Sequence, residues 1–288
     1  MSTTHGKINA VRSIKADGEM AAKKVAFSRP MEVLARIGYG VRGLIYITMG
    51  LLAINVAFGK GGTPTDMQGA ITIIGKQPAG LILLWIILVG LISYSLWGII
   101  RAVFDPLHKG HDLKGLLARC GFLFSAASYG LLILPTYSLM MGVNRVTHGS
   151  QAQPFLASMM STPAGIWAVG LIGLAVVAGG LHQIYQGYKA SFDREFQTDA
   201  LNAKELKWAT QLGRFGTAAR GLVFTLVGGL LCLAAYQSNA RQSVGPDAAL
   251  LTLMHQPYGL WLLGIVATGL IAFGIYSMLN IAWFRLHK

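Results

Sequence analysis

Long apolar segments alternate with shorter polar segments along the chain. The apolar segments cover residues 36–57, 80–104, 118–142, 164–189, 213–236 and 259–284. Each is longer than the roughly 20 residues that a helix rising ~1.5 Å per residue needs to cross a ~30 Å hydrocarbon core. A backbone inside lipid must satisfy its own hydrogen bonds, so each segment is expected to be a helix. The pattern therefore predicts an all-α membrane protein with six transmembrane helices.

A short motif recurs at the start of every second apolar segment. It comprises Arg36, Gly38, Arg42, Gly43 and Tyr46 in the first copy, Arg214, Gly216, Arg220, Gly221 and Phe224 in the third, and, more faintly, Arg119, Gly121, Ser125, Ala126 and Tyr129 in the second. A second marker begins the next apolar segment after each copy. It reads Pro78-Ala-Gly80, Pro163-Ala-Gly165 and Pro257-Tyr-Gly259. We therefore predict three tandem, parallel two-helix repeats in a pseudo-threefold arrangement.

These markers divide the chain into five parts. We assign residues 1–34 to a basic cytoplasmic tail, 35–105 to repeat 1, 106–190 to repeat 2, 191–211 to an amphipathic cytoplasmic linker helix and 212–288 to repeat 3. Apolar residues also recur at helical spacing just before each marker proline, as at Ala70, Ile71 and Ile74. This spacing predicts a short helix on the outer surface in front of the second span of every repeat.

Composition and charge support a membrane location. The 288 residues are 53% hydrophobic and 12% charged, whereas soluble domains carry roughly 25% charged residues. The net charge of +13 does not indicate nucleic-acid binding, because the basic residues lie between the apolar segments. One set of loops is rich in lysine and arginine, while the opposite set has only Lys60, Lys76, Arg145 and Arg241. The positive-inside rule therefore predicts that both termini face the cytoplasm.

The motif Arg-x-Gly-x-x-x-Arg-Gly-x-x-Tyr/Phe and the Pro-x-Gly marker together resemble a bacterial membrane family. That family is built of three tandem two-helix domains and is classed as domain of unknown function 1206. The resemblance covers about residues 33–285 and is weakest in repeat 2, at Ser125 and Ala126. It implies a six-span protein of the bacterial cytoplasmic (inner) membrane. It implies no activity, substrate or cofactor.

Two arginines inside predicted spans are the strongest candidates for function. Arg42 and Arg220 each lie six residues past a boundary arginine, about 9 Å along a helix. A charged residue at the centre of a span costs about 2.5–3.5 kcal/mol on insertion scales, so such residues are often functional. We predict that Arg42, Arg220 and the equivalent Ser125 contact an anion or lipid headgroups. We favour arginines that point outward or downward to headgroup phosphates, as anchors that also close the inner end of the bundle, over a site facing a cavity.

Glycines recur every seven residues in three predicted helices. They are Gly43 and Gly50, then Gly173, Gly180 and Gly187, and finally Gly221 and Gly228. Small residues on one face let two membrane helices approach closely, so we assign these glycines to helix packing.

The remaining polar residues indicate no catalytic or metal chemistry. His182 lacks a second histidine inside a span for haem ligation, and His108 and His111 beside Asp105 and Asp112 fit a solvated loop better than a cation site. The predicted spans contain no Asp or Glu, which argues against a proton- or sodium-coupled pump. We therefore expect no enzyme activity, cofactor or metal.

The favoured function is a non-enzymatic module that binds lipid or another membrane protein, with no nucleic-acid partner. The alternative is an uncoupled transporter or channel for a small anionic or amphipathic solute, with Arg42 and Arg220 forming its inner site.

Overall fold

Six membrane-length helices account for most of the structure. The computed structural model describes residues 29–105, 110, 112–142, 152–189, 203–239 and 244–283. The long elements are α2 (Arg29–Ala57), α4 (Gly80–Phe104), α5 (Leu113–Gly130) with α6 (Ile133–Met140), α8 (Pro163–Lys189), α9 (Ala203–Tyr236) and α11 (Gly259–Trp283). Six apolar stretches within them are long enough to cross a membrane, and the described residues form no strand. The predicted all-α, six-span fold is confirmed.

The third span is interrupted between α5 and α6. The interruption lies at Leu131 and Leu132, within one turn before Pro135. Proline has no N–H to donate to the carbonyl four residues earlier, and its ring crowds that carbonyl, so a helix bends or breaks there. The Thr136 hydroxyl donates a hydrogen bond to the Leu132 carbonyl and so satisfies one group at the break.

A short helix precedes the second span of every repeat, as predicted. These helices are α3 (Met67–Gly75), α7 (Ala152–Met159) and α10 (Pro246–Met254). The predicted apolar positions Ala70, Ile71 and Ile74 are buried in the core, so α3 presses its apolar side inward.

The marker glycine is required by the connection between the short helix and the next span. A Cβ atom on Gly80 or Gly259 would collide with the carbonyl of Gly75 or Met254 at the end of the short helix. The same holds for Gly165 of repeat 2. The Pro-x-Gly marker therefore permits a short helix to end directly over the first turn of a span.

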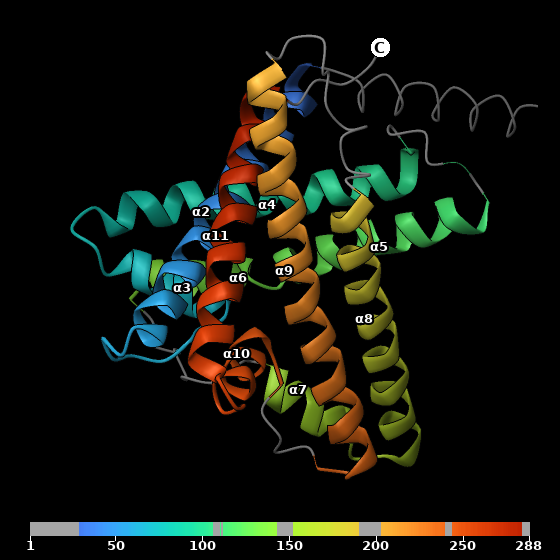
Figure 1. Cartoon of the computed structure of the whole chain (residues 1–288). Coiled ribbons are helices and arrows are strands. Elements are labelled where there is room, and N and C mark those ends of the chain that lie inside the picture. Colours follow the sequence, from blue (N-terminus) through green and yellow to red (C-terminus); the bar gives the residue numbers. More distant parts are fainter. Residues whose placement is uncertain are drawn as a thin grey trace, which may run out of the picture.

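The spans pack largely in chain order. Figure 1 shows α2, α8, α9 and α11 running alongside one another, while α4 and the α5–α6 pair run across them. Close packing joins α2 to α4, α4 to α5, α8 to α9 and α9 to α11, and α11 returns to α2. Among the described spans that follow one another in the chain, the third (α5–α6) and the fourth (α8) do not pack closely against each other.

Small residues form equivalent contacts between successive repeats. A Cβ placed on Gly43 of α2 would lie 2.6 Å from the Gly274 carbonyl oxygen of α11, and one on Gly180 of α8 would lie 2.7 Å from the Gly221 carbonyl oxygen of α9. At the corresponding position of α4, the Ser95 hydroxyl donates to the carbonyl of Ala126 in α5. The second helix of each repeat thus meets the first helix of the next at backbone distance. The pseudo-threefold arrangement holds for these three contacts.

The other glycines predicted to pack helices also lie at these interfaces. Gly50 faces the Ala267 carbonyl of α11, while Gly173, Gly187 and Gly228 lie in the α8–α9 contact.

Two boundaries differ from the predicted division of the chain. Helix α9 begins at Ala203 and continues without a break to Tyr236, so residues 203–211 extend the fifth span and do not form a separate linker helix. Residues 29–34, assigned to the tail, belong to α2. The rest of the predicted tail and linker lies outside the described residues.

Candidate functional site

Arg42 lies inside the protein and not at its lipid-facing surface. Its side chain is 8% exposed, and it donates hydrogen bonds to Tyr94 Oη at 2.7 Å and to Ser277 Oγ at 3.1 Å. The guanidinium carbon lies 4.8 Å from the ring centroid of Tyr39, 5.2 Å from that of Tyr94 and 4.9 Å from that of Phe273. The predicted direction, outward or downward to headgroup phosphates, is therefore wrong for Arg42. Helix α4 supplies the acceptor that draws the side chain inward.

Arg220 approaches the same place from α9. It is half-buried, and its Nε donates to Tyr46 Oη at 2.9 Å. Its guanidinium carbon lies 4.7 Å from the ring centroid of Phe224 and 5.0 Å from that of Phe273. Arg42 and Arg220 thus converge on one ring, Phe273 of α11.

A third buried arginine, Arg101 of α4, joins them and was not among the predicted site residues. It is 5% exposed, and its NH1 donates to Tyr39 Oη at 3.4 Å. Its guanidinium carbon lies 4.4 Å from the Phe122 ring centroid and 5.7 Å from the rings of Tyr94 and Trp97.

Arg101 stands in the last turn of α4, where a basic residue at the membrane boundary is expected. One signal could have identified it. Repeats 2 and 3 carry Gln186 and Asn280 at the same distance from their marker prolines, so this position is polar in all three repeats.

Ser125 lies beside the arginines although it carries no charge. It occupies the position on α5 that Arg42 and Arg220 occupy on α2 and α9, and it interacts with the hydroxyl of Tyr94. Arg101 packs over Phe122, which lies on the preceding turn of α5. The neighbouring helix α4 therefore supplies the guanidinium that repeat 2 lacks.

We call these groups the arginine–aromatic cluster, defined as Arg42, Arg101 and Arg220 with the rings of Tyr46, Tyr94, Tyr129 and Phe273. Tyr129 of α5 packs its ring 4.4 Å from that of Tyr94 and is 2% exposed. Its hydroxyl has no hydrogen-bond partner among the residues that the structure describes. A buried hydroxyl without a partner is rare in folded proteins and often marks a place for a ligand or a bound water.

No carboxylate balances the charge of this cluster within the described spans. Their only acidic residues are Glu32 and Glu205, each in the first turn of its helix, and Glu32 pairs with Arg36 at 2.6 Å. A contact with a ring face stabilises a desolvated cation by about 2 kcal/mol or more, while desolvating one charge costs several kcal/mol. Arg42 and Arg220 therefore carry positive charge into the protein, where their described contacts are rings and hydroxyls.

The aspartates considered for a cation site have structural roles. Asp105 accepts a hydrogen bond from the Gly110 N–H at 2.8 Å, and Asp112 caps α5 by accepting from the Gly115 N–H at 3.0 Å. The histidines beside them, His108 and His111, lie outside the described part of the chain. His182 is exposed and pairs with Gln186 one turn along α8.

Comparison with known proteins agrees with the repeat structure. The family described as "Domain of Unknown Function (DUF1206)" matches residues 37–105, 120–190 and 215–285, which are the three repeats. A relative from Bacillus subtilis (strain 168), "Uncharacterized protein YxxB", is 32% identical over 245 residues, covering 85% of this chain and 88% of the relative. No solved structure matches the chain. The chain is a three-repeat membrane protein that belongs to the DUF1206 family.

Proposed function

We propose that this protein is a non-enzymatic module of the cytoplasmic membrane that binds an anionic group at the arginine–aromatic cluster. The observation that carries the proposal is the convergence of Arg42, Arg101 and Arg220 where the described spans offer no carboxylate. An anion held there would pair with Arg42 and Arg220, whose described contacts are rings and hydroxyls.

The chemistry of the cluster suits a phosphate or a carboxylate. A guanidinium group presents a planar fork of donors that matches two oxygens of either anion. Tyr129 adds a buried hydroxyl that has no hydrogen-bond partner among the described residues. The described cluster offers cations, hydroxyls and rings but no pairing of a nucleophile with a base, so binding is favoured over catalysis. The anion has two sources, a lipid headgroup or a free solute.

A second candidate function is uncoupled passage of a small anion. It is favoured by the inward direction of Arg42 and by its convergence with Arg220 on Phe273. The ligand experiment below separates the two candidates, because a solute path requires the free anion to bind without acyl chains.

Binding of three probes to the detergent-purified protein tests the proposal. The probes are dioctanoyl phosphatidylglycerol, dioctanoyl phosphatidylcholine and glycerol phosphate. Phosphatidylglycerol is expected to bind more tightly than the zwitterionic lipid, and Arg220→Gln to weaken its binding by about tenfold, or 1.4 kcal/mol, through loss of a charge-assisted contact. Arg42→Gln should act in the same direction.

Arg214→Gln is the matched control, because Arg214 lies on the same helix and donates to the Tyr188 carbonyl away from the cluster. Unchanged binding of all three probes in both cluster variants would overturn the proposal. Equal binding of glycerol phosphate and phosphatidylglycerol would identify a free anion, and flux of glycerol phosphate into proteoliposomes would then favour the transporter.

We further propose that both termini face the cytoplasm of a bacterial inner membrane. Single cysteines in a background lacking Cys120 and Cys232 provide the measurement. An impermeant maleimide is expected to label Gly61→Cys, Ser150→Cys and Gln242→Cys in intact cells. Lys109→Cys and Lys204→Cys should react only after the cells are permeabilised. Reversal of this pattern would invert the proposed orientation.

A further inference from the structure

One hydrogen bond joins the motif of repeat 3 directly to the motif of repeat 1. Arg220 of α9 donates from Nε to the hydroxyl of Tyr46 in α2 at 2.9 Å. In the three copies of the motif, Arg42 is the equivalent of Arg220, and Tyr129 of α5 is the equivalent of Tyr46. The same hydrogen bond between repeats 1 and 2 would therefore run from Arg42 to Tyr129.

This equivalent bond between Arg42 and Tyr129 is not formed. Arg42 donates to Tyr94 of α4 and to Ser277 of α11 instead. The Tyr129 hydroxyl is buried and has no hydrogen-bond partner among the described residues. A buried polar group in this state often marks the place of a ligand or a bound water.

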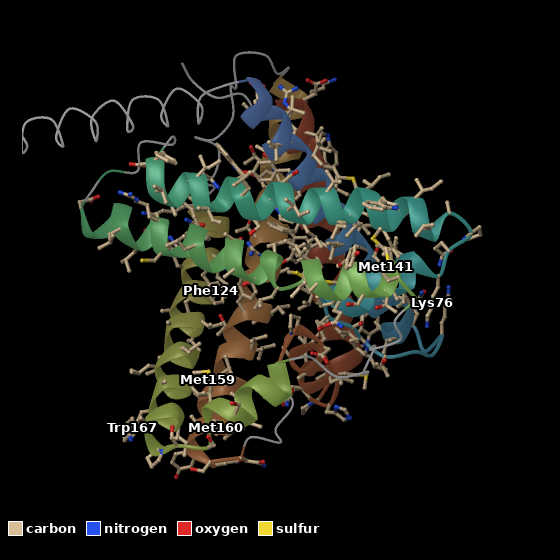
Figure 2. The ribbon with its side chains drawn as sticks, turned by 180° about the vertical axis from the view of Figure 1, so that it is seen from behind. Lys76, Phe124, Met141, Met159, Met160 and Trp167 are labelled. Atoms are coloured by element: carbon tan, nitrogen blue, oxygen red, sulfur yellow. The ribbon has the colours of Figure 1, made fainter. Side chains whose placement is uncertain are left out.

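The direction of α5 explains why the two pairs differ. Figure 1 shows α2 and α9 alongside one another and α5 across them, and Figure 2 shows the crossing α5 from behind, with Phe124 on it. The crossing helix does not present Tyr129 to Arg42 as α2 presents Tyr46 to Arg220. The Tyr129 hydroxyl still lies close enough to Arg42 and Arg220 for both of their charges to act on it.

Both arginines keep donor groups that no residue of the described chain uses. Arg220 is half-buried and makes its hydrogen bond through Nε, so both of its terminal nitrogens lack a hydrogen-bond acceptor. Arg42 uses Nε and one terminal nitrogen, so its other terminal nitrogen lacks one too. Helices α2, α5 and α9 therefore each contribute hydrogen-bond donors to one region of the cluster.

The number of these donors favours one class of anion. A guanidinium fork occupies two oxygens of a carboxylate or a phosphate. With the Arg220 fork on two oxygens, Arg42 and Tyr129 need a further acceptor, which a carboxylate lacks and a phosphodiester offers only as weakly accepting ester oxygens. A phosphate monoester has a third terminal oxygen. Its charge of about −1.5 to −2 at pH 7 also matches the two positive charges of Arg42 and Arg220.

We infer that the arginine–aromatic cluster binds a phosphate monoester, held by Arg220 of α9, Arg42 of α2 and the hydroxyl of Tyr129 in α5. This inference rests on the proposed function and narrows its anion to one chemical class. The phosphate bridges Arg42 and Tyr129, which correspond to the residues that pair directly between repeats 3 and 1. The monoester has two sources, the headgroup of phosphatidic acid or a free phosphate ester.

Matched monoesters and diesters test the inference on the detergent-purified protein. The lipid pair is dioctanoyl phosphatidic acid and dioctanoyl phosphatidylglycerol, and the free pair is glycerol phosphate and dimethyl phosphate. The monoester of a pair that binds is expected to bind at least about tenfold more tightly than the diester, through its additional charge-assisted contacts.

Tyr129→Phe separates the third oxygen from a general effect of charge, because it leaves every arginine in place. It should weaken phosphatidic acid binding by about tenfold and phosphatidylglycerol binding by about twofold, since an ester oxygen accepts less strongly than an ionised one. Tyr137→Phe is the matched control, because Tyr137 lies on α6 of the same span and is 47% exposed. It should leave the binding of both lipids unchanged.

Arg220→Lys provides a second variant that keeps the charge. Lysine is a point charge without the planar fork of arginine, so this variant should also reduce the advantage of the monoester over the diester. Thermal midpoints of the ligand-free proteins identify any variant that is misfolded.

The outcomes separate the inference from the proposed function. Equal binding of monoester and diester, with both lost in Arg220→Gln, would overturn the inference and leave anion binding standing. An equal loss of both lipids in Tyr129→Phe, or no loss of either, would also overturn the inference. Absence of binding by every probe would overturn both.

The free pair identifies the source of the phosphate. Glycerol phosphate that binds as tightly as phosphatidic acid would support the inference with a free ester as the ligand. Binding of phosphatidic acid alone would support it with a lipid headgroup as the ligand.

Discussion

Replacing Gly180 with leucine is expected to lower the free energy of unfolding by at least about 1–3 kcal/mol, the usual cost of overpacking a tight contact. A Cβ on Gly180 would lie 2.6 Å from the Thr225 backbone nitrogen and 2.7 Å from the Gly221 carbonyl oxygen. Both are backbone atoms of α9, which cannot move aside as a flexible side chain can. The leucine must therefore separate α8 from α9, and contacts along both helices will weaken. Unfolding in mixed detergent micelles provides the measurement.

The adjacent residue supplies the control. Gly179 is exposed, and a Cβ there would meet no heavy atom within 4 Å. Gly179→Leu adds the same side chain to the same helix, and it also removes the intrinsic helix penalty of glycine, about 1 kcal/mol. Its stability should equal or exceed that of the natural protein. Equal losses in the two variants would show that α8 tolerates leucine poorly for reasons unrelated to α9.

Tyr94→Phe is expected to destabilise the protein by about 1–3 kcal/mol, because it removes an acceptor from a buried charged donor. The hydroxyl of Tyr94 accepts the 2.7 Å hydrogen bond from Arg42, whose side chain is 8% exposed. Ser277 would remain as an acceptor for Nε, but the terminal nitrogen would lose its bond to Tyr94. The aromatic ring stays in place, so the loss reports on the hydroxyl and not on packing.

Tyr129→Phe removes the hydroxyl of the neighbouring tyrosine, whose ring centroid lies 4.4 Å from that of Tyr94. Tyr129 is as buried as Tyr94, but its hydroxyl has no described partner. The change should leave the stability of the ligand-free protein unaltered or slightly raised, since a buried unsatisfied group is removed. In the binding assay the same variant should weaken phosphatidylglycerol binding. A large loss of stability without ligand would show that the hydroxyl has a structural partner, which would contradict its assignment to the ligand.

Local patterns in the sequence were sufficient to predict most of the architecture. The repeated motif defines three units, and helical spacing before Pro78 and Pro257 places α3 and α10. The seven-residue glycine spacing marks a face that must meet another helix, because a seven-residue repeat returns nearly to the same side of a helix. These features depend on neighbouring residues along one helix, which the sequence displays directly.

The direction of the arginines could not be obtained in this way. Arg42 immediately precedes Gly43 and so lies at the margin of the packing face of α2. A side chain at such a margin can turn either toward lipid or toward the interior. The choice depends on where α4 brings the hydroxyl of Tyr94, which is set by packing between helices. Arg101 was missed for a related reason, because a position in the last turn resembles an ordinary boundary arginine until Phe122 and Trp97 are seen around it.

In repeat 2 the motif alone does not predict which residues pack against its glycine. Gly121 carries the same motif position as Gly38, yet one glycine contacts an aromatic residue and the other faces open space. Helix α8 has Gly179 at the position where α4 has Tyr94, and α8 does not pack closely against α5. A glycine at this motif position is therefore compatible with a close helix contact or with open space, and the sequence of its own helix does not show which one is formed.

The closure of α11 onto α2 also sets the order of assembly during synthesis. Arg42 and its acceptor Ser277 are separated by 235 positions in the chain. At the ribosomal rate of roughly 5–20 residues per second, α2 waits about 10–50 seconds in the membrane before α11 is made. During that interval the glycine face of α2 and the Nε of Arg42 lack their final partners, while Tyr94 arrives much earlier with α4. A nascent chain that stalls before α11 therefore keeps Arg42 in the membrane with one of its two hydrogen-bond acceptors missing.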